Sequence, residues 1–429
     1  MQMKQSPLKL PITLLVLGAC WSIVYIVPFI QYIWYNPFQD FLGATNMQMG
    51  LLITIYGFGN VFGAPIGGWV ADRFNYKYVY VGSVFLNGVF SLLFVLNPNY
   101  GFAIVMWIGF AVASLFMNYP THIKIIRSLA ADKDQGKIFG LNETCIGIFN
   151  ILINAMMMLV YVKWMEGIAG MKAAIISVAL LSFVLTALAL LILDPPKASE
   201  TIQKEKEEKR NVIADFKLIF KSPATWLVAI TVFSVYSYLT TMSYFTPYFT
   251  DVLGVTIVFT GWLAILRQHG MTLVGAPIGG LLADKIKSPA KVLLGVYAVG
   301  ILGLVYLLMA DRGVTAAMLI VLTLVLSASV YVGRGCYYAT ITESGVPRNL
   351  TASTIGVAAA VGFSPDLFQF TLFGYWLDTY GKTAYTYMFT FQAIVLVIGA
   401  VAAVGILRLK KKNAGNSGAT DGDDAPAVV

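Results

Sequence analysis

The chain has 429 residues, of which 58% are hydrophobic and only 12% are charged. Soluble domains carry roughly 45–50% apolar and about 25% charged residues, so a soluble globular enzyme is excluded. A chain this apolar is not disordered either, and three cysteines are too few for a disulfide scaffold. The composition therefore predicts a polytopic membrane protein.

Transmembrane helices are predicted from the length of the apolar runs. A spanning helix needs about 20 mostly apolar residues, because about 30 Å of hydrocarbon is crossed at about 1.5 Å per residue. This criterion predicts twelve helices, at residues 11–38, 47–72, 78–96, 101–128, 137–162, 171–193, 224–250, 257–283, 289–310, 315–343, 350–378 and 384–408. The predicted fold is an all-α multi-pass membrane protein.

The net charge of +8 has a topological explanation. Almost all Lys and Arg residues fall in the loops and tails on one side of the predicted helices. The exceptions are Lys163, Lys172, Arg312 and Lys382 on the opposite side, and Arg267 and Arg334 within helices. This asymmetry predicts that both termini are cytoplasmic in a protein of the cell (inner) membrane, and no nucleic-acid partner is expected.

The N-terminus admits a second interpretation. Lys4 and Lys9 precede an apolar run that includes Cys20, which is the pattern of a lipoprotein signal. The run continues to Trp34, however, so cleavage at Cys20 would remove half of a predicted helix. We therefore expect a retained helix with Cys20 as a small apolar side chain.

The two halves of the chain repeat each other. The run GAPIGGWVADRF at 63–74 recurs as GAPIGGLLADKI at 275–286, and DFLGAT at 40–45 recurs as DVLGVT at 251–256. Two ordered matches predict parallel repeats of six helices each. The predicted division is a six-helix bundle over 1–193, a cytoplasmic linker over 194–222, a second bundle over 223–408 and a disordered tail over 409–429.

The repeated segment ends in a Gly-x-x-x-Asp-Arg-x-x-x-Lys motif, from Gly68 to Lys77, with a degenerate copy from Gly280 to Lys287. With this motif the chain resembles the major facilitator superfamily, and in particular its bacterial organic-anion and sugar-acid permeases. The resemblance implies two six-helix bundles that rock around a central cavity. It also implies gating roles, which fall on Gly68, Asp72, Arg73, Lys77, Gly280, Asp284 and Lys285.

The motif departs from the family pattern at one position, and its gating roles have a physical basis and an alternative. Asn75 replaces a glycine that the family commonly has in this turn, and asparagine also tolerates left-handed backbone geometry. Gly68 is expected to let a neighbouring backbone approach, and Asp72 to lie against the positive end of a helix dipole. The alternative is that these loop charges only set the topology.

Charged side chains at membrane depth are costly and mark candidate sites. Arg334 lies roughly 13 Å from the cytoplasmic end of its helix at about 1.5 Å per residue. Tyr331, Arg334 and Tyr338 are spaced to share one helical face. A guanidinium flanked by phenols suits a carboxylate or phosphate, whereas the alternative is a structural ion pair with Asp366.

Arg267 lies in the eighth predicted helix, farther from the cytoplasmic end of its helix than Arg334 is from the end of its own. It is predicted either to contact an anionic substrate or to extend to the outer membrane interface. Asp366 follows Ser364 and Pro365, and a proline there is expected to break the eleventh helix. Asp366 is therefore a candidate for proton coupling, with permanent neutralisation of Arg334 as the alternative.

Two further coupling candidates lie in the first half. His122 and Glu143 fall near the cytoplasmic ends of the fourth and fifth helices, close to Lys124 and Arg127 in the sequence. They form either a proton relay or an intracellular gate in which Glu143 reaches one of the two cations.

Tyrosines complete the predicted substrate site. Tyr25 and Tyr32 share one face of the first helix, and Tyr236 and Tyr244 share a polar face of its repeat partner, the seventh. Such faces either contact substrate or join helices through hydroxyl groups.

The predicted function is a secondary active transporter that moves a small organic anion, such as a sugar acid, sugar phosphate or carboxylate, by proton symport or anion exchange. A neutral sugar or nucleoside is the alternative substrate, and a transporter-like sensor is a further class. No ATP-binding motif or Cys/His metal spacing occurs, so neither an enzyme nor a cofactor is predicted. The partners expected are the substrate and the lipid bilayer, with a functional monomer.

Overall fold

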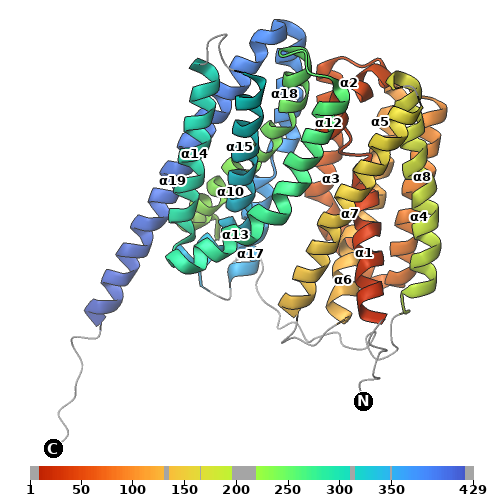
Figure 1. Ribbon diagram of the computed structural model, residues 1–429. Coiled ribbons are helices and arrows are strands. Elements are labelled where there is room, and N and C mark those ends of the chain that lie inside the picture. The colour runs from red at the N-terminus through yellow and green to blue at the C-terminus, as the bar shows by residue number, and fades with distance from the viewer. Residues whose placement is uncertain are drawn as a thin grey trace, which may run out of the picture. The chain divides into compact units, whose positions relative to one another are not determined.

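The computed structural model describes residues 9–129, 135–164, 166–195, 219–309, 315–347 and 350–420. Within these ranges the regular structure is entirely helical (Figure 1). The helices of the first half are α1 (Lys9–Ile26), α2 (Gln31–Leu42), α3 (Asn46–Arg73), α4 (Tyr76–Leu96), α5 (Tyr100–Ala111), α6 (Tyr119–Ser128), α7 (Gln135–Lys163) and α8 (Gly167–Ile192). Those of the second half are α10 (Pro223–Ser243), α11 (Phe245–Asp251), α12 (Ile257–Ile265), α13 (Met271–Ile286), α14 (Pro289–Met309), α15 (Ala316–Cys336), α16 (Thr340–Glu343), α17 (Thr351–Gly362), α18 (Pro365–Tyr380) and α19 (Ala384–Thr420).

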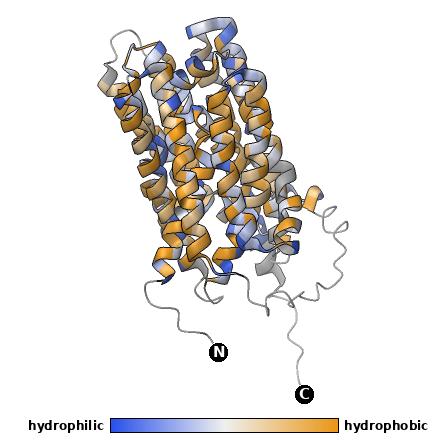
Figure 2. Cartoon of the chain, turned by 90° about the vertical axis from the view of Figure 1, so that its right-hand side faces the viewer, coloured by the Kyte–Doolittle hydropathy of each residue, from blue (hydrophilic) through white to orange (hydrophobic). Residues whose placement is uncertain are grey.

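Each predicted segment coincides with one helix or with consecutive helices. Nine helical stretches of the described residues are long and apolar enough to cross a membrane, so the multi-pass fold is confirmed and the count of twelve stays a prediction. Large apolar side chains such as Leu191, Leu302 and Val401 are exposed, and hydrophobic residues run along the helices in view in Figure 2. Surface of this kind is expected where lipid replaces water as the solvent.

Polar side chains at the N-cap start many of these helices. The side chains of Thr45, Asn75, Asn99, Thr256 and Thr315 each accept a hydrogen bond from a backbone N–H in the first turn of the helix that follows. Each cap satisfies a donor that has no partner within the helix. The caps therefore fix where these spans begin.

Prolines and widened turns interrupt several spans. Residues 27–30, which include Pro28, separate α1 from α2, and the expected break at Ser364–Pro365 is confirmed because α17 ends at Gly362. Two π-helical segments, η1 (Val112–Asn118) and η3 (Leu266–Gly270), join α5 to α6 and α12 to α13. Proline removes a backbone donor, and π-helical turns occur often at functional sites.

The chain forms two compact units that do not follow the sequence repeat. Unit 1 comprises Met1–Glu207, Ser243–Leu273 and Asp366–Tyr385, and unit 2 comprises Glu208–Met242, Val274–Pro365 and Thr386–Val429. Parts of the second half therefore pack with the first half. The bundle boundaries predicted from the repeat stay a prediction, and the linker residues 196–218 lie outside the described residues.

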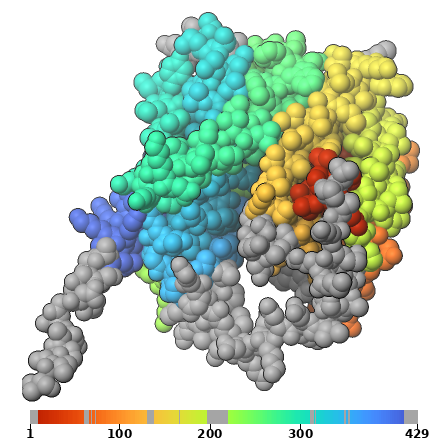
Figure 3. Space-filling view, turned by 60° about the horizontal axis from the view of Figure 1, so that its bottom comes forward, coloured from red at the N-terminus to blue at the C-terminus, as the bar shows by residue number. Residues whose placement is uncertain are grey.

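Unit 1 is held together by close helix contacts and buried amides. Helix α1 lies against α7, where Gly18 meets Cys145, and the space-filling view shows the same neighbours (Figure 3). The Asn87 side chain donates to the Ile23 carbonyl at 3.2 Å and to Ser182 Oγ at 3.1 Å, joining α4 to α1 and α8. Interhelical polar contacts of this kind stabilise helices in lipid.

Unit 2 is built around α10, α14, α15 and α19. Gln392 Oε1 accepts hydrogen bonds from Ser237 at 2.8 Å and Thr241 at 2.9 Å, which ties α19 to α10. Tyr297 of α14 donates to the Thr231 carbonyl at 3.1 Å. The predicted disordered tail begins at 409, but helix α19 continues to Thr420. A helix that has already formed is extended far more easily than a new one is started.

The repeated GAPIGG motif has the same packing role in both halves. A Cβ on Gly67 would lie 2.7 Å from the Phe116 carbonyl oxygen, and one on Gly279 would overlap the Val332 carbonyl oxygen. Only glycine fits at these two corresponding positions. The motif therefore brings α3 against η1 and α13 against α15.

Candidate functional site

Arg334 lies on the face of α15 opposite an exposed apolar stripe. Met318, Val321 and Val325 form an exposed apolar stripe along this helix. About 2.5 turns separate Val325 from Arg334 at about 3.6 residues per turn, so the arginine points to the opposite side. The exposed Arg334 is therefore on the side of α15 away from the apolar stripe.

The tyrosines predicted to flank Arg334 have unequal environments. Tyr331 is buried against Gly275 of α13, with the Tyr331 Cβ 2.7 Å from where a Gly275 Cβ would lie. Helix α15 ends at Cys336, and Tyr338 falls in the 3₁₀ turn η4 (Tyr337–Ala339). Tyr338 therefore lies beyond the end of the α-helix, and its place on one face with Tyr331 and Arg334 stays a prediction.

Arg267 is fully buried in unit 1, so its predicted extension to the membrane interface is wrong. Its Nη2 donates to Thr246 Oγ1 at 2.7 Å, and its guanidinium lies 6.0 Å from the centre of the Phe245 ring. Thr246 donates in turn to the Tyr32 carbonyl at 3.3 Å. The widened turn η3 and these contacts hold the cation inside the protein.

Asp366 is 1% exposed and begins the first turn of α18. Its Cβ is 3.0 Å from where a Cβ on Gly57 of α3 would lie, so the glycine makes room for the acid. The predicted pairing of Asp366 with Arg334 and its role in coupling stay predictions.

Three of the predicted tyrosines belong to an aromatic cluster in unit 1. The Tyr25 hydroxyl donates to the Ser114 carbonyl of η1 at 3.4 Å. The Tyr32 ring stacks on Phe370 with centroids 5.5 Å apart, and the Tyr244 hydroxyl donates to the Phe370 carbonyl at 3.0 Å. Phe370 of α18 therefore meets an aromatic group of α2 and another from the junction between α10 and α11.

The fourth tyrosine lies in unit 2. The Tyr236 ring packs edge-on against Phe363, next to the break between α17 and α18, with centroids 4.7 Å apart. Thr240, about one turn along the same helix, is buried and donates to the Ser237 carbonyl at 2.8 Å. This hydroxyl therefore bonds within its own helix.

His122 is buried in a hydrogen-bonded chain in unit 1. The Tyr80 hydroxyl donates to the Leu17 carbonyl at 3.2 Å, so it accepts from His122 Nδ1, which is also 3.2 Å away. Asn142 Nδ2 lies 3.1 Å from His122 Nε2 and donates to it. The hydrogen bonds thus assign a neutral ring with its proton on Nδ1.

Protonation of His122 requires a change in Asn142. A proton on Nε2 needs an acceptor, and Asn142 Oδ1 has no hydrogen-bond partner among the described residues. Rotation of the amide would present this oxygen to the ring. The relay role of His122 stays a prediction, and it requires the Asn142 amide to rotate.

The cations near His122 have contacts of their own. Lys124 Nζ donates to the Ala71 carbonyl at 2.8 Å, near the end of α3, and lies 5.8 Å from the Tyr76 ring centre. Glu143 is exposed. Whether Glu143 acts as a gate or a relay with Lys124 or Arg127 stays a prediction.

The motif after α3 is described in part. The side chains of Gly68 and Asp72 lie outside the described residues. Arg73 is exposed, with its guanidinium 5.4 Å from the Trp69 ring centre, and Lys77 Nζ is 6.0 Å from the centre of the Tyr78 ring. Asn75 is extended, with φ −64°, and caps α4, so the left-handed geometry considered for it is not needed.

In the degenerate copy, Asp284 and Lys285 are exposed. A Cβ on Gly280 would meet no described atom within 4 Å. The close approach expected at the motif glycine is therefore made by the preceding residue, Gly279, in this half.

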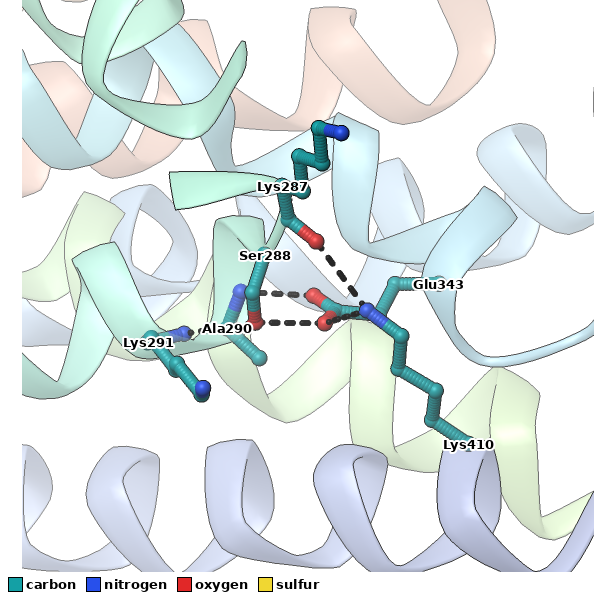
Figure 4. A network of polar contacts seen from close by, with 6 residues as sticks. All are labelled: Lys287, Ser288, Ala290, Lys291, Glu343 and Lys410. Atoms are coloured by element: carbon teal, nitrogen blue, oxygen red, sulfur yellow. Dashed lines mark hydrogen bonds and ion pairs between the residues drawn. The ribbon is translucent and has the colours of Figure 1, made fainter. Parts of the chain in front are cut away.

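A buried carboxylate organises the end of unit 2 beside this copy (Figure 4). Glu343 accepts hydrogen bonds from Ser288 Oγ, from the Ala290 N–H at 2.8 Å and from Lys410 Nζ at 2.9 Å. Lys410 also donates to the carbonyl of Lys287, which has a left-handed backbone with φ 54°. Glu343 thus caps α14 and ties it to α19, beside a cavity of about 600 Å³.

We expect Glu343→Ala to lower the free energy of unfolding by about 2 kcal/mol, because three donors lose a charged acceptor. Lys410→Gln is expected to cost less than about 1 kcal/mol, because Lys410 is 46% exposed and water replaces its bonds. Thermal unfolding of the two purified variants measures the difference. Equal losses would contradict the capping role.

Sequence reasoning missed several polar groups at one end of unit 1. Asp378 bonds to Asn46 and Met47, and Asp251 accepts from Asn36 Nδ2 at 2.7 Å. The repeat makes Asp251 the counterpart of Asp40, but a charge at the end of a membrane span is common and does not by itself indicate a function. No pattern in the sequence indicated Asp378.

The family of the chain follows from comparison with known proteins. The model of the Major Facilitator Superfamily matches residues 11–368, and the chain belongs to this family. It is therefore a membrane transporter rather than an enzyme.

Curated relatives match most or part of the chain. Inner membrane protein YihN of Escherichia coli is 26% identical over 91% of this chain and 94% of its own length. Inner membrane protein YqcE of Escherichia coli is 25% identical over 86% of this chain and 87% of its own. The probable galactarate/D-glucarate transporter GudP of Pseudomonas putida is 29% identical over only 27% of this chain and 25% of its own.

Solved structures share the fold. A bacterial homologue of the human lysosomal transporter Spinster, in an inward-facing conformation, has a TM-score of 0.73 at 15% identity over 99% of this chain and 100% of its own. The nucleoside transporter NupG has a TM-score of 0.69 at 15% identity over 94% and 99%. A D-xylose-proton symporter gives 0.67 at 15% identity over 93% and 96%.

Proposed function

We propose that this protein is a secondary active transporter that moves a small organic anion across the cell membrane by alternating access. The observation that carries the anion assignment is Arg334, an exposed cation on the face of α15 opposite its lipid-facing stripe. A charged side chain at membrane depth is costly where it faces lipid, so an arginine on the other side of a membrane helix is a candidate for function. Its planar fork matches carboxylate and phosphate oxygens.

Arg267 is the second proposed cationic contact. It is held by Thr246 and Phe245 in a fixed orientation, and its guanidinium carries five donors in a rigid fork. The partial similarity to a probable galactarate/D-glucarate transporter supports a sugar acid as the substrate. Proton symport through Asp366 or His122, and anion exchange, are the two proposed modes of coupling.

A neutral sugar or nucleoside is the second candidate substrate. The stacked Tyr32 and Phe370 rings and the neighbouring Tyr244 favour it, because aromatic faces pack against sugar rings and bases. In this case Arg334 has a structural role. A nucleoside transporter and a D-xylose symporter share the fold, which leaves both substrate classes compatible with it.

The test is a thermal-shift panel on purified protein with sugar acids, sugar phosphates, dicarboxylates, neutral sugars and nucleosides. A ligand at about a hundred times its Kd stabilises the folded state by about 2.7 kcal/mol. We expect anions to stabilise the wild type and to lose this effect in Arg334→Gln, with partial retention in Arg334→Lys. Stabilisation by neutral compounds in all three proteins would contradict the anion assignment.

A further inference from the structure

The first turn of α3 has its four free backbone donors satisfied in an unusual way. Thr45 and Gln48 form a capping box, in which Thr45 Oγ1 accepts from the Gln48 N–H and Gln48 Oε1 accepts from the Thr45 N–H. This leaves the N–H groups of Asn46 and Met47, which have no partner within the helix.

The carboxylate of Asp378 binds both remaining donors. Its Oδ1 accepts from the Asn46 N–H at 2.9 Å and its Oδ2 from the Met47 N–H at 2.8 Å. Oδ1 also accepts from Asn46 Nδ2 at 2.8 Å, while Asn46 Oδ1 accepts from the Tyr35 hydroxyl at 2.8 Å. One carboxylate near the end of α18 thus completes the cap of α3, and Asn46 extends the contact to α2.

Below this cap the backbones of α3 and α18 touch. A Cβ on Gly374 would overlap the Asn46 carbonyl, and a Cβ on Gly50 would overlap the Phe370 carbonyl. One turn further along, Thr54 and Thr371 are joined by a hydroxyl–hydroxyl hydrogen bond of 2.8 Å. Small residues at intervals of about one turn are the usual means of bringing membrane helices into backbone contact.

We propose that Asp378 is a gating residue that latches α18 to the N-terminus of α3 and so holds the outer end of the transporter closed. Helix α3 belongs to the first sequence repeat and α18 to the second, so alternating access has to separate them at this end. The inference rests on the proposed function and on the predicted orientation of the chain. The Gly68–Lys77 motif was predicted to gate the opposite end, and Asp378 gives the outer end its own contact.

The latch is weak enough to open in each transport cycle. Asp378 is exposed, so water replaces its hydrogen bonds when the helices separate. The interaction of a carboxylate with helix N–H groups still favours the closed state through the helix dipole. Its removal is therefore expected to shift the conformational equilibrium about tenfold without unfolding the protein.

The test is the distance between spin labels on Asn97→Cys and Lys382→Cys, in a background without the three native cysteines. Both sites are exposed, and the loop after α4 lies near α3, since Tyr100 bonds to the Gln48 carbonyl. We expect Asp378→Asn to increase the long-distance population about tenfold over the parent protein. Asp40→Asn is the matched control, since Asp40 is an exposed carboxylate at the same end with no hydrogen bond among the described residues.

A second variant separates failure of the latch from failure of alternating access. Gly374→Val forces α3 and α18 apart sterically and is expected to make the long distance dominant. If Gly374→Val opens the outer end and Asp378→Asn matches the parent, the latch is overturned and alternating access stands. If neither variant populates the long distance, alternating access itself fails. An equal effect of Asp40→Asn would also overturn the latch, because general charge removal would then explain the shift.

Discussion

Replacing Gly279 by valine is expected to lower the free energy of unfolding by about 3 kcal/mol, since its side chain has no room against α15. A Cβ at this position overlaps the Val332 carbonyl oxygen, which is backbone and cannot rotate away. A Cβ on Gly335 of α15 would likewise overlap the Ala276 carbonyl oxygen of α13, so the two helices are in backbone contact at two places. A valine at position 279 would push both contacts apart. Thermal unfolding in detergent measures the loss.

Gly280 provides the matched control. It is the next residue on the same helix, and a Cβ there would meet no described atom within 4 Å. Gly280→Ala is expected to leave stability unchanged or to raise it by up to about 1 kcal/mol through higher helix propensity. Similar losses in the two variants would show that helix flexibility, rather than the contact with α15, decides stability here.

Replacing Arg267 by glutamine is expected to weaken anion binding by at least about a hundredfold if the proposed substrate assignment is right. Two hydrogen bonds to a charged group contribute about 1.5–3 kcal/mol each, and glutamine retains neither the charge nor the fork. The residue is fully buried and fixed by Thr246, so no neighbouring cation moves easily into its place. Titration with the anion found in the thermal-shift panel measures the change.

Arg267→Lys keeps the charge and is expected to bind with intermediate affinity. The alternative is a purely structural cation. In that case Arg267→Gln would lower the unfolding temperature of the ligand-free protein while the affinity for the anion remained that of the wild type. This outcome would leave Arg334 as the sole proposed cationic contact.

Much of the fold was predictable because membrane helices follow a simple length rule. Every predicted segment coincides with a helix or a group of consecutive helices, and the break before Pro365 occurs where the missing backbone donor requires it. Other interruptions were missed. The π-helical turns η1 and η3 depend on how side chains pack across helices, and no local sequence pattern determines them.

The candidate site was predictable in part. Charges at membrane depth identified Arg334, Arg267 and Asp366, because such residues rarely face lipid. Their environments were not predictable: extension to the interface was one of the two alternatives for Arg267, and the residue is buried against Thr246. The sequence also did not predict that α15 ends at Cys336 and that Tyr338 lies in a 3₁₀ turn.

The sequence by itself determined the class of protein, the positions of its membrane helices and the internal repeat, since apolar length and residue identity along the chain encode all three. Only the tertiary structure decided what the repeated glycines do and which acids act between helices. Gly279 rather than Gly280 meets a neighbouring backbone, and Asp378 caps a helix more than three hundred residues earlier in the chain. Such contacts depend on which helix faces are brought together in space, and that information is not local to any segment.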